Sequence, residues 1–323
     1  MMQTLNLITF PGAPNLPLFI AMDEGLFEKH QLHVAHTTTP SSIFQFEQFA
    51  AGQFDVAGTA FDNVVAYKEH QGAAHLDGPL DVYAFMGASQ IALSLVAAPH
   101  IKTVAELAGT SVAMDALDTG FAFVLHEMLA HAGLERDAVR LAAVGATPQR
   151  FESVKAGEHA ATLTIEPFTA MARGAGLNVL DNSTQRFDDY QGGVFATTRR
   201  YASQHAPHLE AFVEGYLEGL AVVLDPLQRE MCKDTLLRHM PAIKAAMADG
   251  ILERLADPAT GLTPHAGVSS PGIETVLDLR RRYHPLGHAV GDGNRYVHLH
   301  SALTYARISD ARTGDTSPGD ASQ

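Results

Sequence analysis

The repeated alternation of strand-like and helix-like apolar patterns constrains the fold of this chain more than any other feature. Leu5–Phe10 and Leu32–Thr39 alternate with a period of two, and the segment between them, Leu16–His30, places its apolar residues on one helical face. A helix at Ile43–Ala51 and a strand at Asp55–Ala60 continue the succession. Because strands that alternate with helices are typical of parallel sheets covered by helices, we predict an α/β fold.

The same pattern restarts near the middle of the chain, which predicts a second unit. Two predicted strands, Leu80–Ala88 and Ala92–Ala97, mark the boundary, and the strand–helix succession then continues to about residue 187. We therefore predict two α/β units, at about 1–90 and 93–187, each a mostly parallel sheet covered by helices.

The last third of the chain has a different pattern. One more strand is predicted at Val194–Thr198, and the residues after it are mainly helical to about Arg282. These helices pack most simply on the first unit. The final segment, 311–323, is polar and rich in Gly, Ser, Pro and Asp, so we expect it to be disordered.

Two helix starts carry recognisable capping residues. Ser42 is a candidate N-cap for the helix at Ile43–Ala51, since its hydroxyl could accept a hydrogen bond from a first-turn amide. Thr103 and Glu106 have the spacing of a capping box at the start of a short helix, Thr103–Leu107.

Composition excludes several classes of function. The formal net charge is −14, so nucleic acid is not an expected partner. The basic cluster Arg280–Arg282 is interpreted as a solvated helix face. Cys232 is the single cysteine, which excludes an internal disulfide, and apolar runs such as Ile91–Pro99 are too short to span a bilayer. The seventeen histidines show no ligand spacing, so no metal and no cofactor is predicted.

Polar and small residues gather where the predicted strands end. Ligands of open α/β sheets bind outside the carboxyl ends of the strands, so these segments are expected to line one cleft between the units. The segments are Phe10–Asn15, Thr39–Ser42, Thr59–Asn63, Gly87–Gln90, Ala116–Gly120, Val144–Thr147 and Thr164–Pro167.

Several segments resemble a known family. The resemblance is to type 2 periplasmic solute-binding proteins of ABC importers, in the subgroup that binds nitrate, sulfonates, taurine and thiamine-pyrimidine precursors. Three segments are similar to segments of these proteins: "AMDEGLFEKHQLHV" (21–34), "FEQFAAGQFDVAGTA" (46–60) and "IKTVAELAGTSVAM" (101–114). "LHEMLAHAGLERDAVRLAAV" (125–144) and "VKAGEHAATLTIEPF" (154–168) extend the resemblance, in the family's order, over about residues 3–200. Gln31 and Ala160–Ala161 depart from the family pattern.

The resemblance implies an architecture and a function. The first lobe would comprise 1–90 and 190–310 and the second lobe 93–187, joined by two crossover strands near Gly87–Leu93 and Val179–Phe195. A small organic solute would be captured between the lobes by hinge closure, and the closed monomer would dock transiently on a membrane permease. The location would be periplasmic or on the outer face of the membrane.

The strand ends and the resemblance together select the candidate ligand-binding residues. They are Phe10, Pro11, Asn15, Ser41, Ser42, Thr59, Phe61, Asp62, Ser89, Asp118, Thr119, Gly120 and Glu166. Asp62 could instead be only a helix cap. Because this set contains three carboxylates and no Lys or Arg, a neutral or partly cationic heterocycle, stacked on Phe10 or Phe61, is favoured over a strongly anionic ligand.

An alternative function remains open on the same scaffold. No export signal precedes the strand that begins at Leu5, so either a leader has been removed or the protein acts in the cytoplasm as an enzyme or a ligand sensor. A decarboxylase-like or desulfinase-like enzyme is the main form of this alternative. The loop after the first strand has no thiol, and no motif pairs His100 or His126 with a serine, so no catalytic residue is predicted.

Overall fold

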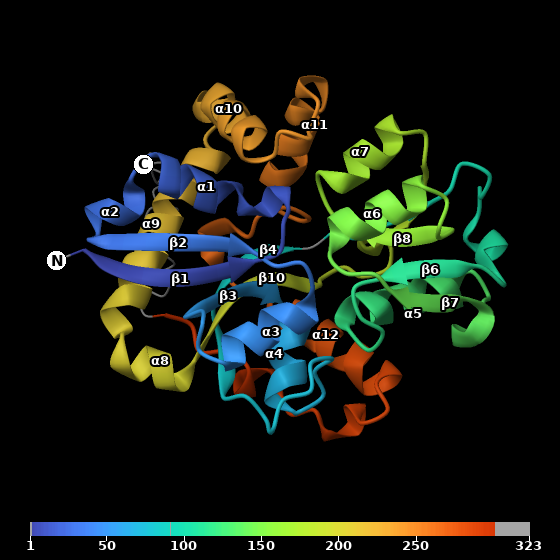
Figure 1. Ribbon diagram of the computed structural model, residues 1–323, viewed down its shortest axis with the longest axis horizontal. Helices are drawn as coiled ribbons and strands as arrows, with labels where there is room; N and C mark the ends of the chain where they lie inside the picture. The colour runs from blue at the N-terminus through green and yellow to red at the C-terminus, as the bar shows by residue number, and fades with distance from the viewer. Residues whose placement is uncertain (1, 91, 301–323) are drawn as a thin grey trace, which may run out of the picture.

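The computed structural model describes residues 2–90 and 92–300, which form two lobes, each built on a five-stranded sheet. Figure 1 shows the two sheets side by side, with helices on both faces of each. This confirms the predicted α/β class and its two-lobe arrangement. The expected disorder of 311–323 concerns residues outside the described part of the chain.

The first sheet has the strand order β2-β1-β3-β10-β4. Its strands are β1 (Gln3–Thr9), β2 (Leu32–Thr38), β3 (Val56–Ala60), β4 (Val82–Gln90) and β10 (Gln191–Thr198). Strand β1 pairs in parallel with β2 and β3, whereas β10 is antiparallel to both β3 and β4. The strand that runs in the opposite direction is therefore the one that arrives from the second lobe.

The second sheet repeats this topology with the order β7-β6-β8-β5-β9. Its strands are β5 (Ser94–Ala97), β6 (Ser111–Met114), β7 (Arg140–Ala143), β8 (Ala161–Thr164) and β9 (Asn178–Asn182). Strand β6 is parallel to β7 and β8, and β5, which arrives from the first lobe, is antiparallel to β8 and β9. The chain thus passes between the lobes twice, after β4 and after β9.

Twelve α-helices in the described residues cover the sheets. They are α1 (Leu16–Asp23), α2 (Leu26–Lys29), α3 (Ser42–Ala50), α4 (Phe61–Lys68), α5 (Gly120–His131), α6 (Thr147–Lys155), α7 (Phe168–Gly174), α8 (Arg199–Gln204), α9 (Ala206–Leu224), α10 (Arg229–His239), α11 (Ala245–Ala256) and α12 (Ser270–Tyr283). Helix α9 packs on α1 and α2, while α12 packs on α4 of the first lobe and on α5 of the second.

Three local expectations were wrong. The predicted helix Leu16–His30 is broken into α1 and α2, because Gly25 adopts a left-handed conformation with φ 64°. Helix α3 is capped by Ser41, which accepts a hydrogen bond from the amide of Phe44, and Ser42 is the first helical residue. The segment Val104–Leu107 is a short 3-10 helix in which Thr103 makes no side-chain cap.

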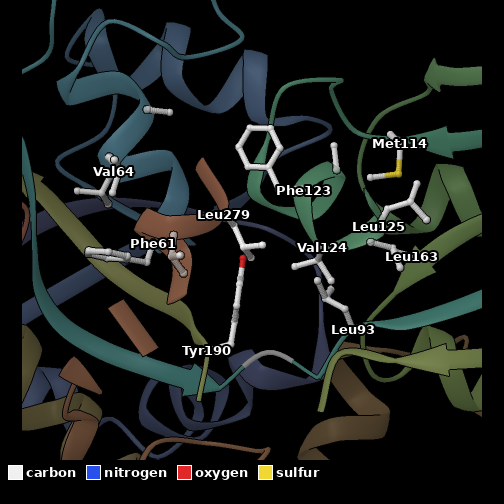
Figure 2. Packing of buried hydrophobic residues seen from close by; sticks show 14 of the residues in the cluster. Phe61, Val64, Leu93, Met114, Phe123, Val124, Leu125, Leu163, Tyr190 and Leu279 are labelled. Atoms are coloured by element: carbon white, nitrogen blue, oxygen red, sulfur yellow. The ribbon is translucent and has the colours of Figure 1, made fainter. Parts of the chain in front are cut away.

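The two lobes share one apolar cluster beneath the cleft. Figure 2 shows part of it, with Leu279 of α12 and Tyr190 lying between Phe61 and Val64 of α4 on one side and Val124, Leu125 and Leu163 of the second lobe on the other. Because this cluster is continuous, the helical C-terminal region contacts both lobes rather than the first alone.

Candidate functional site

A cavity lies where strand ends of both sheets meet, which is the usual position of a ligand site in open α/β sheets. Its volume is about 100 Å³, counted as the space open to the centre of a water molecule. Since one water needs about 10–15 Å³ by this measure, a small organic molecule can enter. The lining residues are Phe10, Gly12, Pro14, Asn15, Gly58, Thr59, Ala60, Asn63, Ala88, Ser89, Gly193, Val194 and Phe195 from the first lobe, and Asp115, Thr119, Gly120, Phe121, Thr147, Arg150 and Ile165 from the second.

Local hydrogen bonds fix the polar groups of the first lobe. The side-chain amide of Asn15 donates to the carbonyl oxygen of Phe10 at 2.7 Å and to the hydroxyl of Thr9 at 3.2 Å. The side-chain amide of Asn63, in the first turn of α4, donates to the hydroxyl of Thr59 at 2.9 Å. These side chains are held before any ligand arrives, which reduces the entropy lost on binding.

Arg150 places a cation at the second-lobe side of the cavity. It lies in α6, and only 1% of the residue is exposed. Its Nη1 donates to the carbonyl oxygen of Leu163 at 2.8 Å, and its Nη2 donates to the hydroxyl of Thr147 at 2.9 Å. Burial lowers the pKa of Arg150 to about 10, an effect that the charge of Asp115 opposes, so the guanidinium stays protonated near pH 7.

Asp115 supplies a carboxylate to the second-lobe wall of the cavity, which Arg150 also lines. It follows β6, and both of its oxygens accept a hydrogen bond from the amide of Ser42, at 3.2 and 3.1 Å. Because Ser42 belongs to α3 of the first lobe, this contact crosses from one lobe to the other. A second contact between the lobes is a backbone hydrogen bond, which the amide of Ala146 donates to the carbonyl oxygen of Pro40 at 2.9 Å.

An ion pair between α4 and α12 lies directly behind the cavity. Both carboxylate oxygens of Asp62 accept hydrogen bonds from Arg280, at 2.8 and 2.7 Å, and both side chains are almost fully buried. The amide of Gly120, the first residue of α5, also donates to Asp62, at 2.6 Å. Asp62 therefore joins the first lobe, α12 and the second lobe.

A second chamber of about 80 Å³ adjoins the cavity and shares Pro14, Ser89 and Ile165 with it. Glu166 and Arg254 of α11 line this chamber and form an ion pair of 2.6 Å. The pair joins the second lobe to the C-terminal helices of the chain.

Comparison with known proteins establishes the family. The family model described as NMT1/THI5 like matches residues 14–228, more than half of the chain. This chain belongs to the NMT1/THI5-like family. No curated protein sequence matches it.

Solved structures confirm the fold of this NMT1/THI5-like protein as that of type 2 periplasmic binding proteins. The periplasmic nitrate-binding protein NrtA from Synechocystis PCC 6803 is 14% identical, with a TM-score of 0.74 over 99% of this chain and 90% of that chain. The periplasmic aliphatic sulphonate binding protein SsuA from Escherichia coli is 18% identical, with a TM-score of 0.67 over 92% of each chain. The ligand binding component of an ABC-type import system from Staphylococcus aureus is 12% identical, with a TM-score of 0.76 over 94% of this chain and 98% of that chain.

Six of the residues selected from the NMT1/THI5-like sequence lie together around the cavity. They are Phe10, Asn15, Thr59, Ser89, Thr119 and Gly120. Ser89 also lines the second chamber, where Glu166 lies.

The other selected residues have different surroundings. Pro11 is half-buried beside the cavity and does not line it, and Ser41 and Ser42 lie at the start of α3. Phe61 is fully buried in the apolar cluster, 6.4 Å from the ring of Tyr296, so it offers no face for stacking. Asp118 is exposed and is not among the residues that line the cavity.

Two expectations about charged residues are corrected, namely the solvation of Arg280 and the possible role of Asp62 as a helix cap. Arg280 is no solvated residue, since it is fully buried against Asp62, although Arg281 and Arg282 are exposed. Asp62 is not the cap of its own helix, because α4 has Ala60 as its N-cap. The preference for a neutral or partly cationic ligand rested on the carboxylates of Asp62, Asp118 and Glu166. Asp62 and Glu166 are paired with arginines and Asp118 is exposed, so these groups no longer favour a cation.

Asp115 and Arg150 line the cavity but were not predicted from the sequence. A signal for Arg150 was present, because Thr147, Phe151 and Val154 share one helical face and Arg150 lies on the same side. An arginine on the apolar face of a predicted helix, one turn after a strand end, indicates a buried cation near the ligand site.

Proposed function

We propose that this chain is the solute-binding component of an ABC-type importer and holds one small organic molecule between its two lobes. The observation that carries the proposal is the cavity, which is bounded by strand ends of both sheets and by preset polar groups. Apolar walls with a few oriented polar side chains are typical of sites for small molecules. The nitrate-binding and sulphonate-binding proteins with the same fold support this proposal.

The proposal includes a conformational cycle. Three contacts join the lobes on the sides of the cavity, so the structure has the features of a closed form. They are the hydrogen bond from the Ser42 amide to the Asp115 carboxylate, the backbone hydrogen bond from Ala146 to Pro40, and the ion pair Glu166–Arg254. A solute would enter when these contacts open, and its departure would require the same opening. We further propose that the closed monomer docks transiently on a permease, at the periplasmic face of a membrane. Among the described residues, no helix has the length and apolar character needed to cross a bilayer.

Thermal unfolding with a panel of solutes tests the proposal. Pyrimidines, sulfonates, taurine, nitrate and aromatic acids are the first candidates, and a solute at 100 times its Kd should add about 2.7 kcal/mol to the free energy of unfolding. Small-angle scattering should show a smaller radius of gyration with the solute than without it. If no solute from the panel or from a cell extract raises the melting temperature, the transport proposal is wrong.

The enzyme alternative has a distinct signature. Among the described residues that line the cavity there is neither Cys nor His, and Cys232 lies in the apolar cluster of α9 and α10. Chemical conversion of the stabilising solute during prolonged incubation, followed by mass spectrometry, would favour an enzyme.

A further inference from the structure

We propose that the solute bound in the cavity is a small organic acid whose carboxylate or sulfonate group is held by Arg150. This inference rests on the proposed function and adds the chemical class of its ligand. It depends on three features of Arg150, namely its burial, its uncompensated charge and its remaining hydrogen-bond donors.

The charge of Arg150 has no close counter-charge in residues 2–90 and 92–300. The side chain is 1% exposed, and its hydrogen-bond acceptors are two hydroxyls and one carbonyl oxygen, all neutral. Asp115 raises the pKa of Arg150 from a distance but does not contact it. Because a guanidinium cannot neutralise itself by losing a proton near pH 7, a buried one is normally paired with an anion. Here the available place for that anion is the cavity that Arg150 lines.

The hydrogen-bond donors of Arg150 lead to the same conclusion. Nη1 makes two hydrogen bonds, to the hydroxyl of Thr162 and the carbonyl oxygen of Leu163, and Nη2 makes one, to the hydroxyl of Thr147. Nε is buried and has no partner in the described part of the chain. Of the five donors of a guanidinium, the Nε–H and one Nη2–H therefore remain, and two such donors match the two oxygens of a carboxylate or sulfonate.

The rest of the cavity suits the body of such an acid. Phe121 lies beside Arg150, with its ring centre 6.0 Å from the guanidinium carbon, and Phe10 and Phe195 line the first-lobe side. An apolar aliphatic or aromatic body would bury its surface against these rings, while its charged end would contact Arg150.

Matched pairs of anionic and neutral probes test the inference on the unmodified protein. The probes are benzoate with benzamide, benzenesulfonate with benzenesulfonamide, and hexanoate with hexanamide, each measured by isothermal titration calorimetry. We expect at least one anion to bind at least ten times more tightly than its neutral partner. Comparison of the carboxylate and sulfonate pairs then distinguishes the two head groups.

Two variants assign the preference to Arg150. Arg150→Gln should remove the preference for the anion, whereas Arg150→Lys should keep part of it, because Lys retains the charge without the paired donors. A preference for the anion that persists in a folded Arg150→Gln protein would overturn the inference. If neither variant folds, the probe pairs on the unmodified protein still decide.

The inference and the proposed function can fail separately. If neutral solutes bind in the cavity as tightly as anions, or more tightly, the inference is wrong and the solute-binding function stands. If no probe and no compound from a cell extract binds, the proposed function is wrong as well.

Discussion

The carboxylate of Asp62 and the guanidinium of Arg280 form a bidentate ion pair in the interior of the protein. The two N–O distances are 2.8 and 2.7 Å, and the side chains are 1% and 0% exposed. The pair joins α4 to α12, and the additional hydrogen bond from Gly120 extends it to α5. A buried pair of this kind is costly to break, since removing one partner leaves an isolated charge.

Replacement of Asp62 by Asn should therefore lower the stability strongly. The guanidinium of Arg280 would lose its counter-charge, and we expect a loss of about 3–5 kcal/mol in the free energy of unfolding. Urea denaturation with linear extrapolation measures the change. Asp278→Asn is the matched control, because Asp278 pairs with Arg281 at the surface and such pairs contribute about 0–1 kcal/mol. Equal small losses in both variants would contradict the structural role of Asp62.

Gly120→Ala should also destabilise the protein, for a steric reason. A Cβ atom at Gly120 would lie 2.6 Å from Cβ of Asp62, which is closer than two non-bonded carbon atoms normally approach. Overpacking of this kind typically costs about 1–3 kcal/mol. Gly78→Ala is the control, since its Cβ would meet no atom within 4 Å. A Gly120→Ala protein with an unchanged melting temperature would show that α4 and α5 are not held so closely.

The ion pair between Glu166 and Arg254 should slow the release of the solute. It joins the lobes beside the cavity but is partly exposed, with 43% of the Arg254 side chain accessible. Its loss in Glu166→Gln should therefore speed dissociation by about two- to fivefold, as expected for a contribution of about 0.4–1 kcal/mol. Stopped-flow displacement measures the rate.

Glu152→Gln provides the control for this experiment. Glu152 pairs with Lys155 within α6, so its loss should leave the dissociation rate unchanged. Equal rates in the Glu166→Gln protein and the unmodified protein would contradict a role for this ion pair in closure.

The stability should fall between pH 6.5 and pH 4 because of two histidines, the buried His126 and the half-buried His36. Burial, and then the neighbouring His239, lower the pKa of His36 to about 4, and burial, and then the charge of Arg136, lower the pKa of His126 to about 4. The unfolded chain binds a proton at each of these positions below pH 6.5, while the folded protein does not until about pH 4. Their contribution is therefore complete above pH 6.5 and is lost as the pH falls, by at most about 1.4 kcal/mol per pH unit for each histidine.

Replacement of His126 by Phe should make the free energy of unfolding depend less steeply on pH between pH 6.5 and pH 4, because unfolding then takes up one proton fewer. Its Nδ1 is buried without a hydrogen-bond partner among the described residues, so an apolar ring can take its place. The exposed His131 is the control position, and His131→Phe should leave the pH dependence as it is. Unfolding free energies at pH 7 and pH 5 give the difference, and an unchanged slope in His126→Phe would refute the assignment.

Much of the fold could be predicted from sequence because it is a local consequence of periodicity. The strand at Gln3–Thr9 and the helix at Ser42–Ala50 have clear periods of two and 3.6, and both were expected within two residues of their actual bounds. The helix break at Gly25 and the position of the cap at Ser41 rather than Ser42 each depend on the conformation of one residue. That conformation is set by how the chain turns to meet its sheet.

The charges of the site could not be predicted in the same way. Asp62 and Arg280 are 218 positions apart, and only the packing of α12 against α4 brings them together. A strand end identifies which segments meet at a cavity, but it does not tell whether a carboxylate there faces the ligand or an arginine. Arg150 was overlooked because it lies one helical turn beyond its strand end.

Native mass spectrometry is the most direct test of a solute held between the lobes. The protein is incubated with a small-molecule extract of cells and compared with Ala60→Phe, in which the new ring fills the cavity that Ala60 lines. Ala105→Phe, at an exposed position, controls for the added ring. We predict that the unmodified and Ala105→Phe proteins each carry one additional small molecule and that a folded Ala60→Phe protein carries none. An equal load on all three proteins, or no load on any, would contradict the account.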